Sequence, residues 1–254
     1  MGICWMMCMG DCNGGWSKEH IISQSLFESN EVTISGVDWT GNEIKKIPIA
    51  GAVAKILCRE HNSQLSPLDE EIKKVKYAFI NYHGDATDFL TGKSPDCKSV
   101  YEVDGNKFER WLLKTTINHL FYSPVLYAGF SLTRDLVEIV CGKTEFDYKQ
   151  KCGLYMVDPS IHQNFLQNTA NISISPVLLP SGNEKFLIGT LVSIFGHGFF
   201  LKVAQTENCS FQFRGVNLIS EKNFHPQEMG IIQNGKFNNR IRLSFNFRDF
   251  SQSK

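Results

Sequence analysis

The chain has 254 residues, with 26 Lys and Arg against 26 Asp and Glu, so its formal net charge at pH 7 is zero. Hydrophobic residues make up 42% and charged residues 20%, which is typical of a globular protein and excludes a disordered or fibrous one. No apolar run approaches the roughly 18 residues of a membrane span. The balanced charge argues against a surface coated in basic residues for loose nucleic-acid binding, although a local basic groove stays possible.

Three of the eight cysteines fall within the first dozen residues. Residues 1–10 have neither the basic start nor the uninterrupted apolar core of a secretory signal. We therefore expect a reducing, cytoplasmic compartment and no membrane association. Clustered cysteines in such a compartment bind metal more often than they form disulfides.

Cysteine and histidine recur in two pairs that are tens of residues apart. Cys8 and Cys12 are separated by three residues, and Cys58 and His61 by two. Four ligands of these types suit a tetrahedral structural zinc. Cys4 precedes Cys8 by the same spacing and is an alternative ligand, but we favour Cys8 because the first residues of a chain often fray. The simpler alternative is that these cysteines are ordinary buried side chains.

The predicted elements follow in chain order. Turn chemistry and short β-prone runs predict strands at 19–23, 31–34 and 43–49. Ser66 as a cap and Pro67 in the first turn predict a helix that runs through residue 79, followed by a loop at 84–96. Apolar periodicity predicts a second helix at 107–121. Strands are then expected at 172–179, 186–195, 199–204 and 241–247, with a turn at 196–198 between the middle two.

Glu19 and His20 are adjacent in a predicted strand, so their side chains point to opposite faces. A histidine whose pKa is near neutral can deprotonate water. Mg²⁺ prefers oxygen ligands, which the carboxylate of Glu19 and the carboxamide of Asn62 can supply. These groups together would hydrolyse a phosphodiester, because the metal stabilises the developing charge while the imidazole makes the nucleophile.

The cysteine pair, the Glu-His-Ile-Ile-Ser run at 19–23 and the Leu-Cys-Arg-Glu-His-Asn run at 57–62 resemble an HNH endonuclease of the ββα-metal type with a zinc treble-clef support. The resemblance covers residues 4–80, about a third of the chain. It implies that His20 is the general base, that Glu19 helps hold a catalytic Mg²⁺ or Mn²⁺, and that Asn62 is the Asn of the motif. The motif's final His has no clear counterpart. We choose Asp69 as the replacement metal ligand, with Glu70 as the alternative.

The sequence thus predicts an α+β protein in two parts. Residues 1–82 would form the ββα-metal module with its structural zinc, and residues 83–254 an α then β-rich region for substrate or partner recognition. The second part has no catalytic motif. Arg240 and Arg242, together with Phe245 and Phe247, are candidates for a basic and aromatic strand surface that binds nucleic acid, with a solvated strand face as the alternative.

The resemblance implies a metal-dependent endonuclease that cuts DNA in bacterial restriction or anti-phage defence. It also implies a protein partner such as an ATPase or sensor subunit, and the chain is a possible homo-oligomer. Residues 1–76 carry eight basic against ten acidic residues, a net −2, and residues 211–254 carry seven against three, a net +4. This division suggests that the chain binds DNA through a small basic region, or that a partner supplies part of the DNA-binding surface.

A non-catalytic zinc module that binds nucleic acid or a protein is the alternative function. Such a module would keep the zinc ligands and could dispense with His20. Individual residues also have simpler interpretations. His20 would be a satisfied core histidine, Asn62 would bond the backbone beside Cys58, and Asp69 would be an acid in a first helical turn.

Overall fold

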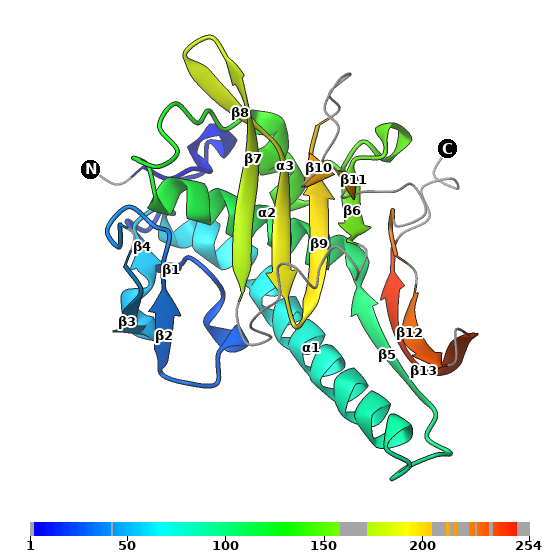
Figure 1. Ribbon diagram of the computed structural model, residues 1–254. Helices are drawn as coiled ribbons and strands as arrows, with labels where there is room; N and C mark the ends of the chain where they lie inside the picture. Colours follow the sequence, from blue (N-terminus) through cyan, green and yellow to red (C-terminus); the bar gives the residue numbers. More distant parts are fainter. Residues whose placement is uncertain are drawn as a thin grey trace.

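The computed structural model describes residues 3–41, 43–157, 172–204, 212–213, 216–217, 224–226, 228–233 and 236–247. Within these residues the protein is a mixed α-helical and β-sheet structure with three α-helices and several small sheets (Figure 1). No helix in the described part of the chain is both long and apolar enough to cross a bilayer.

The N-terminal part consists of short strands that lead into a long helix. Strand β1 (Glu19–His20) pairs antiparallel with β4 (Val53–Ala54). The chain between these two strands forms a second antiparallel pair, which consists of β2 (Glu31–Ile34) and β3 (Lys45–Pro48). All three strands predicted in this part are present, although the first is shorter than expected. Short 3-10 helices also occur here: η1 (Met7–Met9), η2 (Gln24–Leu26) and η3 (Ile49–Gly51).

Helix α1 (Arg59–Leu90) begins seven residues before the predicted start at Ser66. Cys58 is its N-cap, because the Cys58 Sγ accepts a hydrogen bond from the His61 N–H. Pro67 therefore lies inside the helix, where it cannot donate to the carbonyl of Ser63. The hydroxyl of Ser66 donates to that carbonyl at 2.8 Å, which compensates for the missing bond.

The predicted loop at 84–96 is helical as far as Leu90. The predicted boundary between the two parts of the chain, at residue 82, therefore falls inside this unbroken helix. An apolar stripe along α1 packs against the core. The stripe continues past the predicted end of the helix and consists of Leu65, Leu68, Ile72, Val75, Phe79 and Tyr82.

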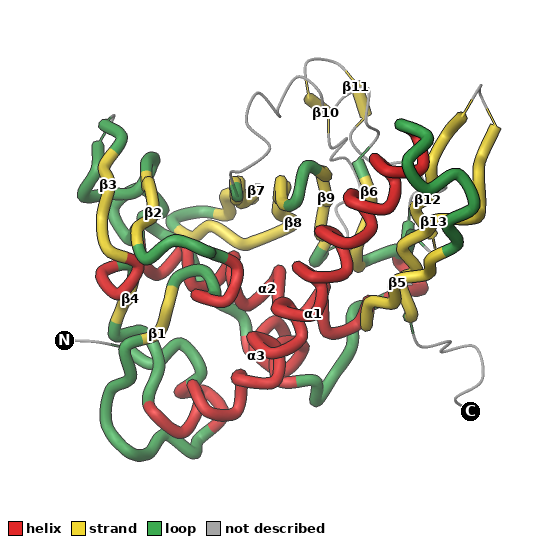
Figure 2. Tube along the Cα trace, turned by 90° about the horizontal axis from the view of Figure 1, so that it is seen from below, coloured by secondary structure: helices red, strands yellow, loops and turns green. Residues whose placement is uncertain are grey.

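Helix α2 (Gly105–Tyr122) matches its prediction closely. Asp104 caps it by accepting a hydrogen bond from the Lys107 N–H at 3.0 Å. The helix is buried on most of its surface and packs against α1, α3 (Arg134–Cys141) and the four-stranded sheet (Figure 2). Its central position explains why several of its polar side chains are buried.

Two further sheets complete the described fold. One is antiparallel in the order β6 (Gly153–Met156), β9 (His197–Lys202), β8 (Glu184–Ile194) and β7 (Ser173–Ser181). The other places β13 (Lys236–Asn246) between antiparallel β12 (Glu228–Gln233) and parallel β5 (Ser99–Asp104). Strands β10 (Gln212–Phe213) and β11 (Val216–Asn217) form a separate pair. One buried cluster includes side chains from Cys4 to Phe245.

Candidate metal centre and polar network

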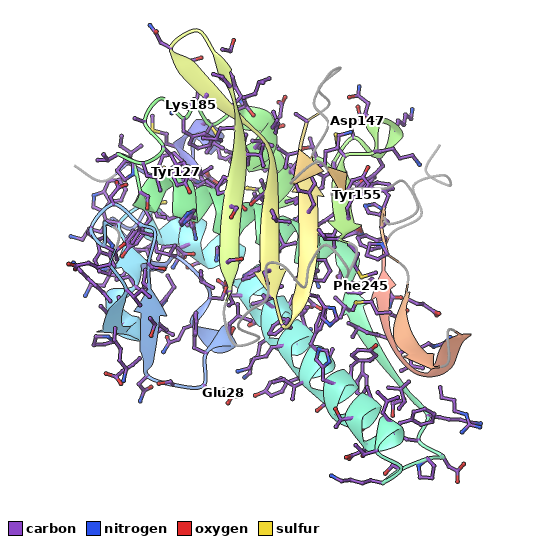
Figure 3. All side chains as sticks on the ribbon, viewed as in Figure 1. Glu28, Tyr127, Asp147, Tyr155, Lys185 and Phe245 are labelled. Atoms are coloured by element: carbon purple, nitrogen blue, oxygen red, sulfur yellow. The ribbon has the colours of Figure 1, made fainter. Side chains whose placement is uncertain are left out.

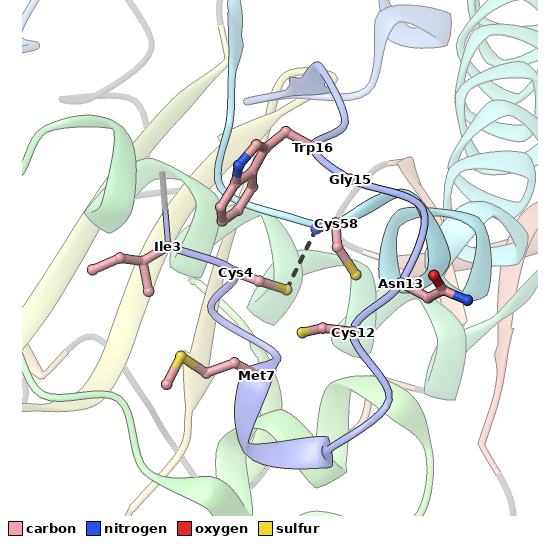
Figure 4. Close-up of a pocket in the computed structure, with 8 residues that line it drawn as sticks. All are labelled: Ile3, Cys4, Met7, Cys12, Asn13, Gly15, Trp16 and Cys58. Atoms are coloured by element: carbon pink, nitrogen blue, oxygen red, sulfur yellow. Dashed lines mark hydrogen bonds between the residues drawn. The ribbon is translucent and has the colours of Figure 1, made fainter. Parts of the chain in front are cut away.

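Four potential metal ligands converge where the N-terminal segment meets the start of α1. The thiol sulfurs of Cys4, Cys12 and Cys58 and an imidazole nitrogen of His61 all lie within 4.8 Å of one another. The Cys4 and Cys12 sulfurs are 3.2 Å and 3.6 Å from His61 Nδ1. Figure 4 shows the three sulfurs pointing toward one another. Three thiols and one imidazole are the donor set of a structural zinc site.

The structure corrects the choice between Cys4 and Cys8. Cys8 is exposed in η1 and lies outside the cluster, whereas Cys4 is buried. The first residues do not fray as expected, because Trp5 and Met6 are buried and the Trp5 N–H donates to the Ile56 carbonyl at 3.0 Å. The apolar residues directly after Cys4 were the available signal that this end of the chain is anchored.

Asp11 orients the histidine of the cluster. Its Oδ1 lies 2.5 Å from His61 Nε2, and its Oδ2 accepts a hydrogen bond from Gln64 at 3.2 Å. The bond to His61 chiefly, and then that to Gln64, lowers the pKa of Asp11. With Nε2–H donated to a carboxylate, Nδ1 keeps its lone pair for a metal. Asp11 could not be identified from the sequence, because nothing in the spacing of its neighbours marks a carboxylate as a partner of His61.

The three thiols differ in acidity. Burial raises the pKa of Cys4, and desolvation followed by its hydrogen bond to Cys4 raises the pKa of Cys12 to about 12. Burial also acts to raise the pKa of Cys58, but hydrogen bonds from the backbone of His61 and Asn13 lower it on balance. Cys58 is therefore the thiol that ionises most readily, and a bound divalent cation would deprotonate the others.

The two carboxylates predicted to bind Mg²⁺ are both paired with a buried lysine. Lys114 Nζ lies 2.9 Å from Glu19 Oε1, and 2.9 Å and 2.7 Å from the two carboxylate oxygens of Asp69. Lys114 is 2% exposed and Glu19 4%, so this contact is shielded from water. Asp69, at residue 11 of α1, is not the first-turn helix acid of the simpler interpretation.

Hydrogen bonds extend the Lys114 contact in both directions. Toward α1, the hydroxyl of Ser23 donates to Asp69, and Trp111 Nε1 donates to Ser23 Oγ at 2.7 Å. Toward the N-terminus, Asn118 Nδ2 donates to Glu19 Oε1 at 3.0 Å, and Trp5 Nε1 donates to Asn118 Oδ1 at 3.0 Å. We call these seven residues the polar network: Trp5, Glu19, Ser23, Asp69, Trp111, Lys114 and Asn118.

Helix α2 contributes three members of the polar network. Trp111, Lys114 and Asn118 are spaced by three and four residues, so they lie on one face of the helix. Because Lys114 and Asn118 lie on the same face as a core tryptophan, their burial could have been predicted from the sequence, but it was not. Their partners come from the N-terminal segment, β1, the residue that precedes η2, and α1, which sequence spacing alone does not bring together.

His20 and Asn62 occupy different surroundings from Glu19. His20 is half-buried in β1 opposite Val53, and none of the described residues hydrogen-bonds to its imidazole. Asn62 Nδ2 donates to Ser17 Oγ at 2.8 Å, so its side chain does not bond the backbone beside Cys58. In the part of the chain that the structure describes, the Cys4 cluster is the only group of three or more His, Cys, Asp or Glu with ligand atoms close enough for one ion.

The predicted basic and aromatic surface on β13 is only partly present. Arg240 is exposed, and its Nη1 donates to the Pro95 carbonyl at 3.0 Å, while Arg242 pairs with Glu228 at 3.1 Å. Phe245, labelled in Figure 3, is 1% exposed and packs in the core, so it cannot stack on a base. Phe247 stacks on His225 with ring centroids 4.1 Å apart.

No family model, curated protein or solved structure matches this chain. The metal centre and the polar network therefore stand on their geometry alone.

His119 makes folding sensitive to acid. Burial lowers its pKa to about 4, against a weaker opposing effect of Asp38, and its Nε2 lies 3.0 Å from the hydroxyl of Tyr127. A histidine with a depressed pKa contributes stability above its unfolded pKa of about 6.5, and this stability is lost as pH falls toward the folded value. We expect about 2 kcal/mol of unfolding free energy to be lost between pH 7.5 and pH 5 because of His119. Urea unfolding of wild type and His119→Gln at both pH values checks this. An equal loss in the two proteins would show that His119 is not responsible, since both share the same metal centre.

Proposed function

We propose that this chain is a zinc-stabilised endonuclease of the ββα-metal (HNH) type that hydrolyses phosphodiester bonds in DNA. The observation that carries the proposal is the order of elements around the metal centre. The antiparallel β1–β4 pair is followed directly by α1, and Cys58 and His61 lie at the junction. A structural zinc there would fix the start of α1 relative to β1.

His20 would act as the general base. Its imidazole is half-buried and has no hydrogen-bond partner among the described residues, so it is available to take a proton from water. Asn62 lies one residue after the zinc ligand His61, and its Nδ2 is held by Ser17, so its Oδ1 is the atom it can offer to a hard cation. Mg²⁺ or Mn²⁺ would supply charge stabilisation at the scissile phosphate.

The polar network bears on the second candidate function, a non-catalytic zinc module that binds nucleic acid or a protein. Lys114 already neutralises Glu19 and Asp69. A divalent cation would have to displace a buried ammonium to reach either carboxylate. This favours a catalytic metal held chiefly on the Asn62 side, or none. We therefore keep the non-catalytic module as the alternative.

Plasmid cleavage by the zinc-loaded protein tests the proposal. We expect nicking or linearisation with Mg²⁺ or Mn²⁺, and a loss of about 10²- to 10⁴-fold in His20→Ala, because removal of a general base has effects of this size. Cys8→Ala is the matched control, since the Cys8 side chain is exposed and outside the metal centre, and it should cleave like wild type.

The zinc content and melting temperature of His20→Ala should equal those of wild type. Failure of wild type to cut DNA or RNA in every metal tried, with and without proteins encoded beside it, would favour the non-catalytic module. Equal cleavage by wild type and His20→Ala would contradict the role of His20 as general base.

A further inference from the structure

Two histidines that are 114 positions apart in the sequence meet on the surface, on elements outside the metal centre. His83 lies in the second half of α1, and His197 is the first residue of β9. Their Nε2 atoms are 3.2 Å apart, and the ring centroids lie 5.1 Å apart with nearly parallel planes. The Phe195 carbonyl oxygen is also 3.2 Å from His83 Nε2.

The two-residue turn between β8 and β9 positions the Phe195 carbonyl and His197. Phe195 and Gly196 both have positive φ, at 54° and 79°, as a two-residue type I′ turn requires. A phenylalanine rarely adopts this conformation, which costs energy that other contacts must offset. The Phe195 ring stacks on Phe79 of α1 with centroids 5.0 Å apart.

Phe79 is fully buried and lies one helical turn before His83. The stacking contact fixes the β8–β9 turn over α1, and Figure 1 shows this turn lying over the helix. The Phe195 carbonyl and His197 therefore lie beside His83. The site is held in place by a rigid core side chain and needs no rearrangement to bring its groups together.

The hydrogen-bonding capacity of His83 Nε2 does not match its two neighbours. His83 Nε2 carries at most one hydrogen, yet it faces both a carbonyl oxygen, which can only accept, and a second imidazole nitrogen. A cation accepts lone pairs from all three atoms at once. Two imidazoles and a carbonyl suit the borderline ions Zn²⁺, Ni²⁺ and Cu²⁺ better than Mg²⁺ or Ca²⁺. His83 is exposed, so an ion and its remaining water ligands have access.

We propose that His83, His197 and the carbonyl of Phe195 form a second binding site, for a divalent transition-metal ion such as Zn²⁺ or Ni²⁺. The bound ion would connect α1 to the β8–β9 turn. It would have an open coordination shell completed by water, unlike the closed Cys₃His centre at the other end of α1.

Isothermal titration of the zinc-loaded protein with Ni²⁺ tests the proposal. We expect one Ni²⁺ per chain, with the zinc content unchanged as measured by atomic emission. His83→Gln and His197→Gln should each weaken Ni²⁺ binding by about 100-fold, the size of effect expected when one of two linked binding groups is lost. The double variant should weaken binding by much less than the product of the two single effects, because each single variant already removes the chelate.

Thr87→Ala is the control for the conformation of α1. Thr87 is exposed one turn after His83 and bonds its carbonyl without offering an imidazole. This variant should bind Ni²⁺ like wild type. Melting gives an independent readout: Ni²⁺ should raise the melting temperature of wild type and of Thr87→Ala but not of His197→Gln. No Ni²⁺ binding by wild type, or single variants that bind as tightly as wild type, would overturn the proposal.

Discussion

Replacing Lys114 with methionine is expected to destabilise the protein by about 3–5 kcal/mol, because it leaves a buried charge without its partner. The side chain of Glu19 is 5% exposed and that of Asp69 is 33%, so the unpaired carboxylate of Glu19 accounts for most of the loss. Urea unfolding of the zinc-loaded protein measures the effect. Lys74→Met is the matched control: its side chain is 71% exposed, and its pair with Glu71 should contribute less than about 1 kcal/mol.

A second substitution separates the charge from the packing of Lys114. Glu19→Gln in the Lys114→Met background removes the unpaired charge, so it should restore part of the lost stability, whereas in wild type it should destabilise. If Lys114→Met lost no more stability than Lys74→Met, the buried ion pair would not stabilise the fold. Purely additive effects of Lys114→Met and Glu19→Gln would show that the two side chains do not interact.

Cys4→Ser is expected to abolish zinc binding and cooperative folding, whereas Cys8→Ser should leave both unchanged. The apparent free energy of structural zinc binding in small zinc-finger peptides is about 10–16 kcal/mol at pH 7, which is comparable with or larger than the stability of a typical domain. Loss of one of the four ligands removes much of this zinc-binding free energy. The measurements are zinc content per chain and the melting curve, and both cysteine variants make the same chemical change.

The opposite pattern, with zinc lost in Cys8→Ser and kept in Cys4→Ser, would return Cys8 to the ligand set. Zinc retained at wild-type affinity in both variants would mean that neither thiol is a ligand. Cys58→Ser provides a positive control, because Cys58 both lies in the cluster and caps α1. Cys58→Ser should lose zinc binding and cooperative folding, as Cys4→Ser does.

Features fixed by local spacing could be predicted from the sequence. Cys58 and His61 are separated by only two residues, a spacing that lets both side chains reach one ion. Helix α2 has its apolar periodicity and a capping aspartate within one segment, and its bounds were predicted to within two residues. The strands β2, β7 and β8 are marked by composition and turns in the same way.

Features that depend on contacts between distant segments could not be predicted. Pro67 looked like a helix start, because nothing local shows that Cys58 has already begun the helix and that Ser66 replaces the missing bond. Cys4 and Cys8 have equivalent spacing, and the anchoring of Trp5 on Ile56 decides between them. The pairing of Lys114 with Glu19 joins residues 95 positions apart, and a lysine in a helix is ordinarily expected to face solvent.

X-ray absorption at the zinc edge of the purified protein shows directly whether Cys4, Cys12, Cys58 and His61 hold one zinc ion. We expect one zinc per chain with three sulfur ligands at about 2.3 Å and one nitrogen ligand at about 2.0–2.1 Å. Cys4→Ser should lose the zinc signal, while Cys8→Ser should reproduce the wild-type spectrum. A protein that takes up no zinc, or a zinc shell made of oxygen and nitrogen ligands alone, would rule out this metal centre.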